Sequence, residues 1–345
     1  MKIQTVLGPI DPSSAGLVLP HEHLSIAAGA LGVKNKDERF KDYENAAVAM
    51  DTLWWINQNP YSNIPNLQQC EEHEAVIEEL KFFKKYGGGT MVDNTNLGIS
   101  RDINFLKQAS EKTGVNIVAG TGYYVESSRP ETVKLTVEEM AAHMKGELQD
   151  GCDGSTGSIK CGVIGEVGCS WPLLPSEKRA LQAAAQVNVD IGCPVIIHPG
   201  RDDKAPQEIV RVYQEAGGKV DKLIMSHLDR TFLSEDKLVQ FAALGCYCEF
   251  DLFGIELTHY QQKESVDMPG DATRIKSIKS LINSGYEDKI TISQDIHTKH
   301  RMMKYGGHGF SHILLNIIPK MLKRGISQEQ IDKITKVNPQ KWLAY

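Results

Sequence analysis

The sequence predicts an α/β fold, a closed (β/α)8 barrel of the TIM type. Three observations support this prediction. Short β-branched runs alternate with longer helix-like stretches, eight such runs occur, and 345 residues are enough to build one large barrel. We expect a single domain that spans residues 1–345, because no linker, low-complexity tract or internal repeat divides the chain.

The strand candidates are short apolar runs, and each of them ends in Gly, Pro or a polar residue. Strands that alternate with helices on this scale form βαβ units and a parallel sheet. Eight such units favour a closed barrel over an open sheet. The eight candidates are residues 17–20, 89–94, 116–120, 161–166, 194–198, 222–227, 246–251 and 290–295.

The helix candidates show the charge order that a helix dipole favours. Residues 71–86 carry acidic side chains in the first turns and Lys84-Lys85 in the last, and glycines follow. The other candidates are residues 175–191, 204–216, 233–244, 270–284 and 309–324. The segment at about 24–70 is too long for a simple loop, and we interpret it as an elaborated first βα connection over the barrel mouth.

The composition argues against several classes of partner. The chain has 38 Lys and Arg against 44 Asp and Glu, and it has no basic run, so we expect neither nucleic acid nor a membrane surface as a partner. No stretch approaches the ~18–20 apolar residues of a membrane span. The seven cysteines form no Cys-x-x-Cys pair, which is typical of free thiols in a reducing compartment. We therefore expect a soluble, cytoplasmic protein, and the sequence leaves open whether it is a monomer or a homodimer.

Potential metal ligands stand at the ends of five predicted strands, which converge on one mouth of a barrel. His21 and His23 are two residues apart, so in an extended strand both side chains point to the same side and can hold one ion. His198 and His227 would hold a second ion, and a carboxylate between the pairs can bridge the two. A single strand-end histidine is more often structural, but six coincidences at one face favour a binuclear site. The expected ligands are His21, His23, Glu166, His198, His227 and Asp295.

The charges of this set fit two divalent ions. Two ions, two carboxylates, one hydroxide and neutral imidazoles leave a net charge of about +1, which suits an anionic substrate. Mixed nitrogen and carboxylate ligands fit zinc first and manganese second. A metal lowers the pKa of bound water from ~15.7 to about 7. Asp295 is then the natural catalytic residue to orient the hydroxide and accept its proton.

Five motifs resemble the phosphotriesterase family of the amidohydrolase superfamily. They are His21-Glu22-His23, Val163-Ile164-Gly165-Glu166-Val167-Gly168, Ile196-Ile197-His198-Pro199-Gly200, Ser226-His227-Leu228-Asp229-Arg230 and Gln294-Asp295-Ile296-His297. The resemblance covers essentially the whole chain. It implies two divalent metals, an activated hydroxide and hydrolysis of an ester, lactone or amide. Bacterial phosphotriesterases carry a carboxylated lysine at the bridging position, where this chain has Glu166.

Within this family, Trp171-Pro172, residues 295–301 and residues 305–309 resemble the phosphotriesterase-related branch found in animals. That resemblance implies N-acetyltaurine and related N-acyl amino compounds as substrates. The loops after the ligand strands are basic, which would suit a carboxylate or sulfonate. We expect Arg201 and Lys299 to contact the anion and Tyr123 to reach the carbonyl. The alternative is that some of these cations pair with Asp202, Asp203 or Asp229, and that Tyr123 is a packed aromatic.

We expect a metal-dependent hydrolase that cleaves the amide bond of small anionic N-acyl compounds, giving taurine and acetate from N-acetyltaurine. Two alternatives stay open. A lactonase or phosphotriesterase would use the same metal site, and a catalytically silent barrel would bind metal and a metabolite without turnover.

Overall fold

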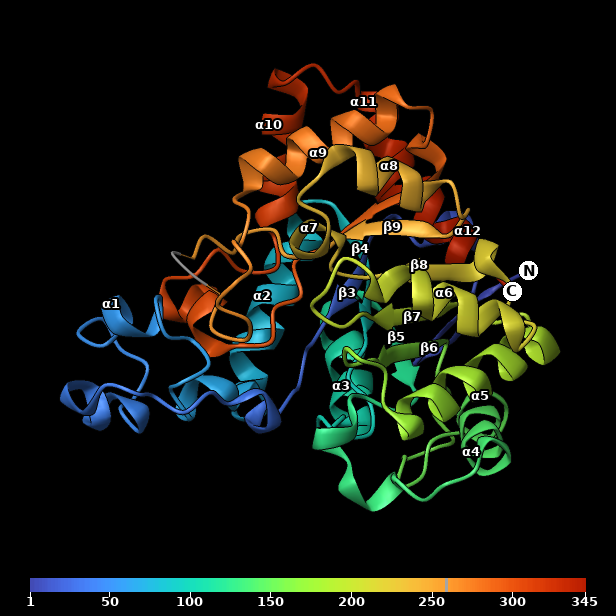
Figure 1. The fold of residues 1–345 in the computed structure, drawn as a ribbon, viewed down its shortest axis with the longest axis horizontal. Helices are drawn as coiled ribbons and strands as arrows, with labels where there is room; N and C mark the ends of the chain where they lie inside the picture. The colour runs from blue at the N-terminus through green and yellow to red at the C-terminus, as the bar shows by residue number, and fades with distance from the viewer. Residues whose placement is uncertain (258–259) are drawn as a thin grey trace.

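The protein is an eight-stranded parallel barrel, as the sequence predicts. The computed structural model describes residues 1–257 and 260–345. Neighbouring strands pair in the order β3 to β10 around the sheet, with helices on the outside (Figure 1). The strands are β3 Leu17–Glu22, β4 Gly88–Asp93, β5 Asn116–Thr121, β6 Val163–Gly168, β7 Val195–His198, β8 Leu223–Met225, β9 Tyr247–Phe250 and β10 Ile290–Ile292.

The last strand, β10, lies beside the first, β3. Hydrogen bonds between the end of β3 and the residues after β10 close the barrel. The hydroxyl of Ser293 accepts the backbone N–H of His21 at 3.1 Å and donates to the His21 carbonyl at 2.7 Å. The Glu22 carboxylate accepts the backbone N–H groups of Gln294 at 2.8 Å and Ile296 at 3.1 Å. These bonds fix the segment that carries Asp295 against the end of β3.

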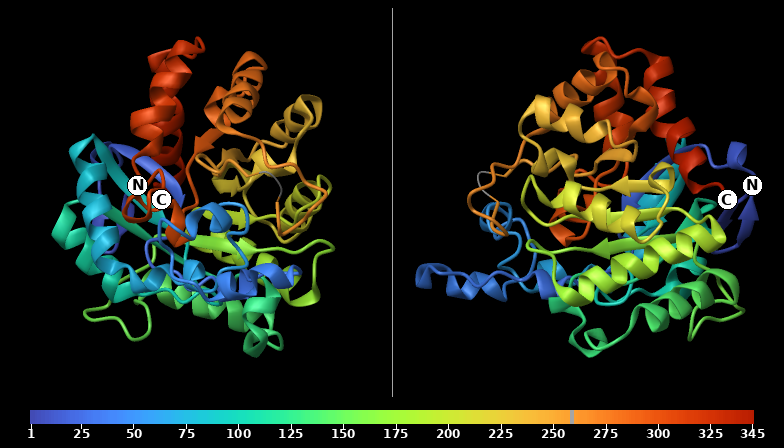
Figure 2. Two further views of the ribbon diagram at one scale, coloured as in Figure 1. Left: turned by 90° about the vertical axis from the view of Figure 1, so that its left-hand side faces the viewer. Right: turned by 45° about the vertical axis from the view of Figure 1, so that its right-hand side comes forward.

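Long helices cover the outer face of the barrel (Figures 1 and 2). The predicted helices correspond to α2 His73–Lys85, α5 Pro175–Ile191, α6 Ala205–Glu215, α8 Glu235–Ala242 and α9 Asp271–Asn283. The stretch predicted as a helix over 309–324 begins later, with a wide turn at Ile313–Ile317 followed by α10 Ile318–Lys323. Pro319 cannot donate the hydrogen bond that a regular helix needs there, and the preceding turn widens.

Two helices that the sequence analysis did not name complete the outer ring: α3 Ile103–Thr113 and α4 Val137–Gln149. Both carry capping signals. Asp102 caps α3, and Thr136 with Glu139 forms a capping box at the start of α4. The remaining elements are the short helices α1 Leu53–Ile56, α7 Leu228–Thr231, α11 Gln328–Asp332 and α12 Asn338–Leu343, and the hairpin β1 Ile3–Thr5 with β2 Gly8–Ile10.

The two ends of the barrel differ in chemistry. The N-terminal end is filled by an apolar cluster into which Trp342 of α12 inserts, and its indole N–H donates to the Lys222 carbonyl at 3.0 Å. Six inward side chains of that cluster are fully buried: Val18, Val92, Val118, Val163, Ile196 and Ile224. The C-terminal end carries the polar residues instead, so any chemistry belongs there.

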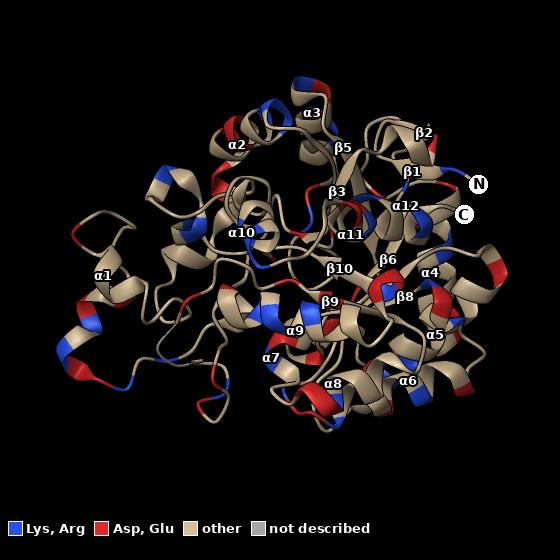
Figure 3. Cartoon of the chain, turned by 90° about the horizontal axis from the view of Figure 1, so that it is seen from above, with Lys and Arg blue, Asp and Glu red and all other residues tan. Residues whose placement is uncertain are grey.

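The long first connection contains only short 3₁₀ turns and α1, and its outer part projects away from the barrel (Figures 1 and 2). Its inner part returns to the barrel mouth, where the Tyr61 ring stacks on His297. Seen from above, positively and negatively charged residues are interspersed along the outer helices (Figure 3). No helix among the described residues combines the length and the apolar composition needed to cross a membrane.

The loop after β10 is tied to the outer ring by Glu79 of α2. Its carboxylate accepts the backbone N–H groups of Met303 at 2.7 Å and Phe310 at 3.1 Å. Burial raises the pKa of Glu79 from 4.5 to about 7. Between these two pH values the folded state holds the proton more firmly than the unfolded state. The free energy of unfolding therefore falls as pH rises through that window.

We predict that Glu79→Gln reduces this pH dependence, because glutamine keeps a carbonyl acceptor and cannot ionise. The difference amounts to about 1.4 kcal/mol for each unit that separates the two pKa values. Urea unfolding at pH 5 and at pH 7.5 measures it. Glu78→Gln is the matched control, because the neighbouring Glu78 side chain is 70% exposed and should leave the pH dependence unchanged. Identical pH dependence in Glu79→Gln and the parent protein would contradict this account.

Candidate metal centre

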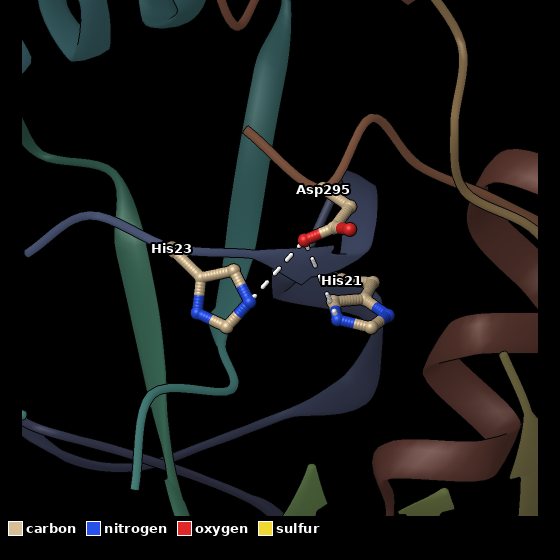
Figure 4. A group of neighbouring side chains, drawn as sticks. All are labelled: His21, His23 and Asp295. Atoms are coloured by element: carbon tan, nitrogen blue, oxygen red, sulfur yellow. Dashed lines mark ion pairs between the residues drawn. The ribbon is translucent and has the colours of Figure 1, made fainter. Parts of the chain in front are cut away.

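The structure brings the six predicted ligands together in one buried group at the C-terminal ends of the strands. Each of their side chains is at most 9% exposed. Figure 4 shows three of them, with Asp295 facing His21 of β3 and His23 just beyond the end of that strand. The Oδ1 atom of Asp295 lies 3.3 Å from Nε2 of His23 and 3.8 Å from Nε2 of His21. His21, His23 and Asp295 therefore form one set of donors around a common point.

Glu166 lies between this set and the second pair of histidines. Its Oε2 atom is 2.8 Å from Nδ1 of His198 and 3.1 Å from Nε2 of His227. Its Oε1 atom is 3.7 Å from Nε2 of His23 on the other side. Nε2 of His21 lies 3.5 Å from Oε2, so the carboxylate as a whole stands between the two groups of imidazoles. This is the arrangement that a carboxylate needs in order to bridge two cations.

Breaks in regular strand geometry turn several ligands inward. Val18 of β3 and Val163 of β6 point into the barrel, so strict alternation would turn residues three positions later outward. The register shifts between Leu19 and Glu22 in β3, and between Ile164 and Val167 in β6. His21 and Glu166 therefore face inward as well.

The backbone is also unusual at two other ligands. His227 has φ +56° and Asp295 has φ +49°, in the left-handed region that costs a non-glycine residue of order 1–3 kcal/mol. The N–H of Asp295 donates to the His21 carbonyl at 3.1 Å, and that of His227 donates to Asp251 at 3.1 Å. These hydrogen bonds hold both ligands in a conformation that the chain alone does not favour.

Asp251 is a site residue that the sequence analysis missed. It follows β9, and its carboxylate lies 2.7 Å from Nδ1 of His227 and 2.8 Å from Nδ1 of His21. A carboxylate behind a ligating imidazole fixes the orientation of the ring and leaves the other nitrogen to face the metal. The signal was present, since 246–251 is a predicted strand that ends in an acid. It was overlooked because that strand end lacks a histidine.

The electrostatics of the centre fit bound cations. Among the described residues, the ion pairs of Glu166, Asp251 and Asp295 are all with histidines, so no lysine or arginine neutralises these buried acids. Nε2 of His21 is buried and makes no hydrogen bond. Burial lowers the pKa of His198 to about 3, which makes it a neutral ligand at pH 7. These residues therefore suit divalent metal ions.

A separate cluster of Glu147, Cys152 and Cys161 also has ligand-like spacing. Here the guanidinium of Arg101 already occupies the space between the donors. Its Nη1 atom lies 2.9 Å from the Glu147 carboxylate and 3.3 Å from Sγ of Cys161. A cation held there would meet this fixed positive charge, so the cluster is a buried ion pair with two packed thiols.

Five of the six predicted ligands, all except His21, line a small cavity of about 30 Å³, room for one or two waters. A larger pocket of about 380 Å³ adjoins it, and Tyr61, Ile255 and His297 line both. The hydroxyl of Tyr61 lies 3.0 Å from Nε2 of His297 at this boundary. A substrate that enters through the larger pocket therefore meets these two side chains before it reaches the ligands.

The predicted substrate contacts lie in different places. Arg201 lines the cavity. Tyr123 is packed in the core against Arg129 and His143, and its neighbour Tyr124 lines the cavity with its hydroxyl 3.4 Å from Nδ1 of His198. Lys299 pairs with Glu71 at 2.6 Å and Glu72 at 3.3 Å. This geometry favours Arg201 and Tyr124 over Lys299 and Tyr123 as groups that face a substrate.

The alternative that Asp202, Asp203 or Asp229 neutralises the basic loops is wrong for the arginines. Asp202 lies near Lys263, and Asp203 pairs with Lys237. Asp229 is taken by Arg274 at 2.9 Å. These acids lie beside other cations, and none of them forms an ion pair with Arg201 or Arg230, the arginines that line the cavity.

Comparisons with known proteins agree with this fold. The sequence model of the phosphotriesterase family matches residues 1–343. The chain belongs to the phosphotriesterase family. Its members are metal-dependent hydrolases, and this chain is accordingly an enzyme of that kind.

Two relatives and one solved structure illustrate the similarity. N-acetyltaurine hydrolase of Xenopus tropicalis is 51% identical, and that of Homo sapiens is 49% identical; each alignment covers all of this chain and 98% of the relative. The crystal structure of a resiniferatoxin-binding protein from Rhodobacter sphaeroides has a TM-score of 0.95 and 28% identity. That match covers 99% of this chain and 95% of the other.

We predict that Asp251→Asn weakens metal binding by about 10–100-fold, because both histidines lose the carboxylate that orients them. Competition with a chromophoric chelator measures the affinity for Zn²⁺ in the metal-depleted protein. Asp203→Asn is the control, since it removes one carboxylate from the same face without touching a histidine. Unchanged affinity in Asp251→Asn would show that this carboxylate does not support the ligands.

Proposed function

We propose that this chain hydrolyses the amide bond of N-acetyltaurine at a centre of two divalent metal ions, with zinc as the first candidate and manganese as the second. The observation that carries the proposal is the position of the Glu166 carboxylate, which lies between His21 and His23 on one side and His198 and His227 on the other. The substrate is supported by the full-length relatives at about 50% identity, which are named N-acetyltaurine hydrolases.

His21, His23 and Asp295 would hold one ion, and His198 and His227 would hold the other, with Glu166 shared between them. When bound, the ions would polarise the amide carbonyl and lower the pKa of a water from ~15.7 to about 7. Because histidine binds a metal as a neutral imidazole, these side chains would supply lone pairs without adding positive charge. Asp251 keeps the rings of His21 and His227 in the tautomer that this requires.

Asp295 is the group placed to move protons. Burial opposes its ionisation, but His297 and the histidines of β3 lower its pKa well below the usual range, so it is a carboxylate at neutral pH. It takes the proton of the attacking water and passes it to the leaving nitrogen as the C–N bond breaks. The balanced reaction consumes one N-acetyltaurine anion and one water, and it yields acetate and zwitterionic taurine.

The proposal extends to the cellular environment and the partners of the enzyme. All seven cysteines carry free thiols, which supports a reducing, cytoplasmic environment. The substrate is a small anion, and we propose that the enzyme acts on it without a nucleic-acid or membrane partner. Gel filtration of the purified enzyme decides between the monomer and the homodimer.

We predict that the metal-loaded enzyme releases taurine from N-acetyltaurine and that a chelator abolishes this release. Parallel assays use N-acetyl amino acids, a lactone and paraoxon. Turnover of the lactone or paraoxon with inert amides would replace the proposed reaction by the lactonase or phosphotriesterase alternative. A protein that binds metal and leaves every compound intact would be the silent barrel.

We predict that Asp295→Ala lowers kcat by about 10²–10⁴-fold, because the proton transfer loses its carrier. Glu166 and the four histidines remain, so most of the bound metal should stay, and elemental analysis of the variant checks this point. Asp267→Ala is a suitable control because that aspartate is exposed. If Asp295→Ala retains metal and full activity, Asp295 is not the proton carrier.

A further inference from the structure

Two arginines follow His198 and His227, the second pair of predicted ligands, in the sequence. Arg201 follows His198 of β7, and Arg230 follows His227 at the end of β8. Both line the cavity that contains the ligands. Because β7 and β8 are neighbours in the sheet, the two guanidinium groups come from adjacent loops on one side of the centre.

Among the described residues, Arg201 and Arg230 have no carboxylate partner. The buried Arg129 and Arg301 have none either, but they donate to backbone carbonyls and do not line this cavity. Two further arginines do have a carboxylate partner. Arg101 pairs with Glu147, and Arg274 lies 2.9 Å from Asp229. In the described part of the chain, no carboxylate lies within ion-pair distance of Arg201 or Arg230. Burying a cation without a counterion is costly, so an anion that completes the site would be bound strongly.

The hydrogen bonds of the two side chains leave donors free. Arg230 is 3% exposed, its Nη2 donates to the Pro199 carbonyl at 3.2 Å, and its Nη1 is buried without a hydrogen-bond partner. Arg201 is half-buried and donates through Nε to the Tyr260 hydroxyl at 2.8 Å. The bond to Tyr260 fixes the stem of Arg201, and the terminal nitrogens stay available.

The rest of the cavity wall has few groups that could bind an anionic group of a substrate. Glu166 and Asp295 would repel a negative group that is not bound to a cation, and most other lining residues are apolar or aromatic. The apolar and aromatic ones are Ile26, Leu31, Tyr61, Ile99, Tyr124, Leu252, Ile255, Tyr260 and Met268. The two arginines are therefore the place in this wall where an anionic group gains charge-assisted hydrogen bonds.

We propose that Arg201 and Arg230 together bind the anionic end of the substrate, a sulfonate on a short arm from the scissile nitrogen. This inference rests on the proposed function, and it assigns the part of the site that selects the amine half. A sulfonate offers three oxygens in a tetrahedral arrangement and so accepts donors from two directions. A planar carboxylate is matched by a single guanidinium fork.

The binding mode has a consequence for orientation. The sulfonate lies on the side of His198 and His227, so the amine half of the substrate points toward the β7 and β8 loops. The cavity is too small for the whole substrate, so the acyl group is left to the side of Tyr61 and Ile255, where the larger pocket of about 380 Å³ adjoins it. Selection by charge should therefore act on the amine half, and selection by size should act on the acyl half.

The test compares N-acetyltaurine with N-propylacetamide, a neutral amide of similar length, in the metal-loaded enzyme. Arg201→Met and Arg230→Met should each raise the KM for N-acetyltaurine by about 10–100-fold, the loss expected for hydrogen bonds to a charged group. The kcat/KM for N-propylacetamide should change little. Arg230→Lys should recover part of the loss, because it keeps the charge without the fork.

Lys237→Met is the matched control, since this nearby lysine is exposed and paired with Asp203 and should leave the KM unchanged. Thermal unfolding of each variant separates loss of fold from loss of binding. An equal loss for both amides in a folded variant would overturn the proposal, as would no loss in either arginine variant.

The role of the two arginines can be tested even if the proposed hydrolysis of N-acetyltaurine fails. If the parent enzyme does not hydrolyse N-acetyltaurine, calorimetric titration of the metal-loaded protein with taurine and with ethanesulfonate tests the arginines alone. Binding of ethanesulfonate that is lost in both methionine variants supports the assignment. Absence of binding to the parent protein overturns it.

Discussion

The shared position of Glu166 is the constraint on which the rest of this site depends. A carboxylate that is 3% exposed and faces imidazoles on both sides is stable only if positive charge surrounds it. Burial opposes its ionisation, but its contacts with His198 and His21 lower the pKa of Glu166 well below the usual range. It therefore stays ionised, and its carboxylate stands between the two donor sets.

The barrel is shaped to keep this carboxylate in place. Register shifts in β3 and β6 turn His21 and Glu166 inward, and left-handed backbone at His227 and Asp295 completes the set. Hydrogen bonds from the end of β3 to residues 293–296 hold the last strand against the first. The apolar N-terminal half of the barrel provides the rigid support on which such irregular geometry is tolerated.

Much of the fold could be predicted because strand–helix alternation is a local signal. The predicted strand at 116–120 and the helix at 175–191 differ from β5 and α5 by at most one residue. The six ligands could be chosen because strand ends converge in any barrel. Other features depend on contacts distant in sequence. Three features follow from packing that no local pattern encodes. Lys299 forms an ion pair with Glu71, Tyr124 rather than Tyr123 lines the cavity, and Asp251 contacts His227.

Metal stoichiometry shows whether the single carboxylate of Glu166 organises two cations. Elemental analysis of the metal-replete protein, after removal of free metal, counts ions per chain. The account predicts two ions in the parent protein, and it predicts that Glu166→Ala loses at least one of them while remaining folded. One ion per chain in the parent protein, or two retained in Glu166→Ala, would contradict it.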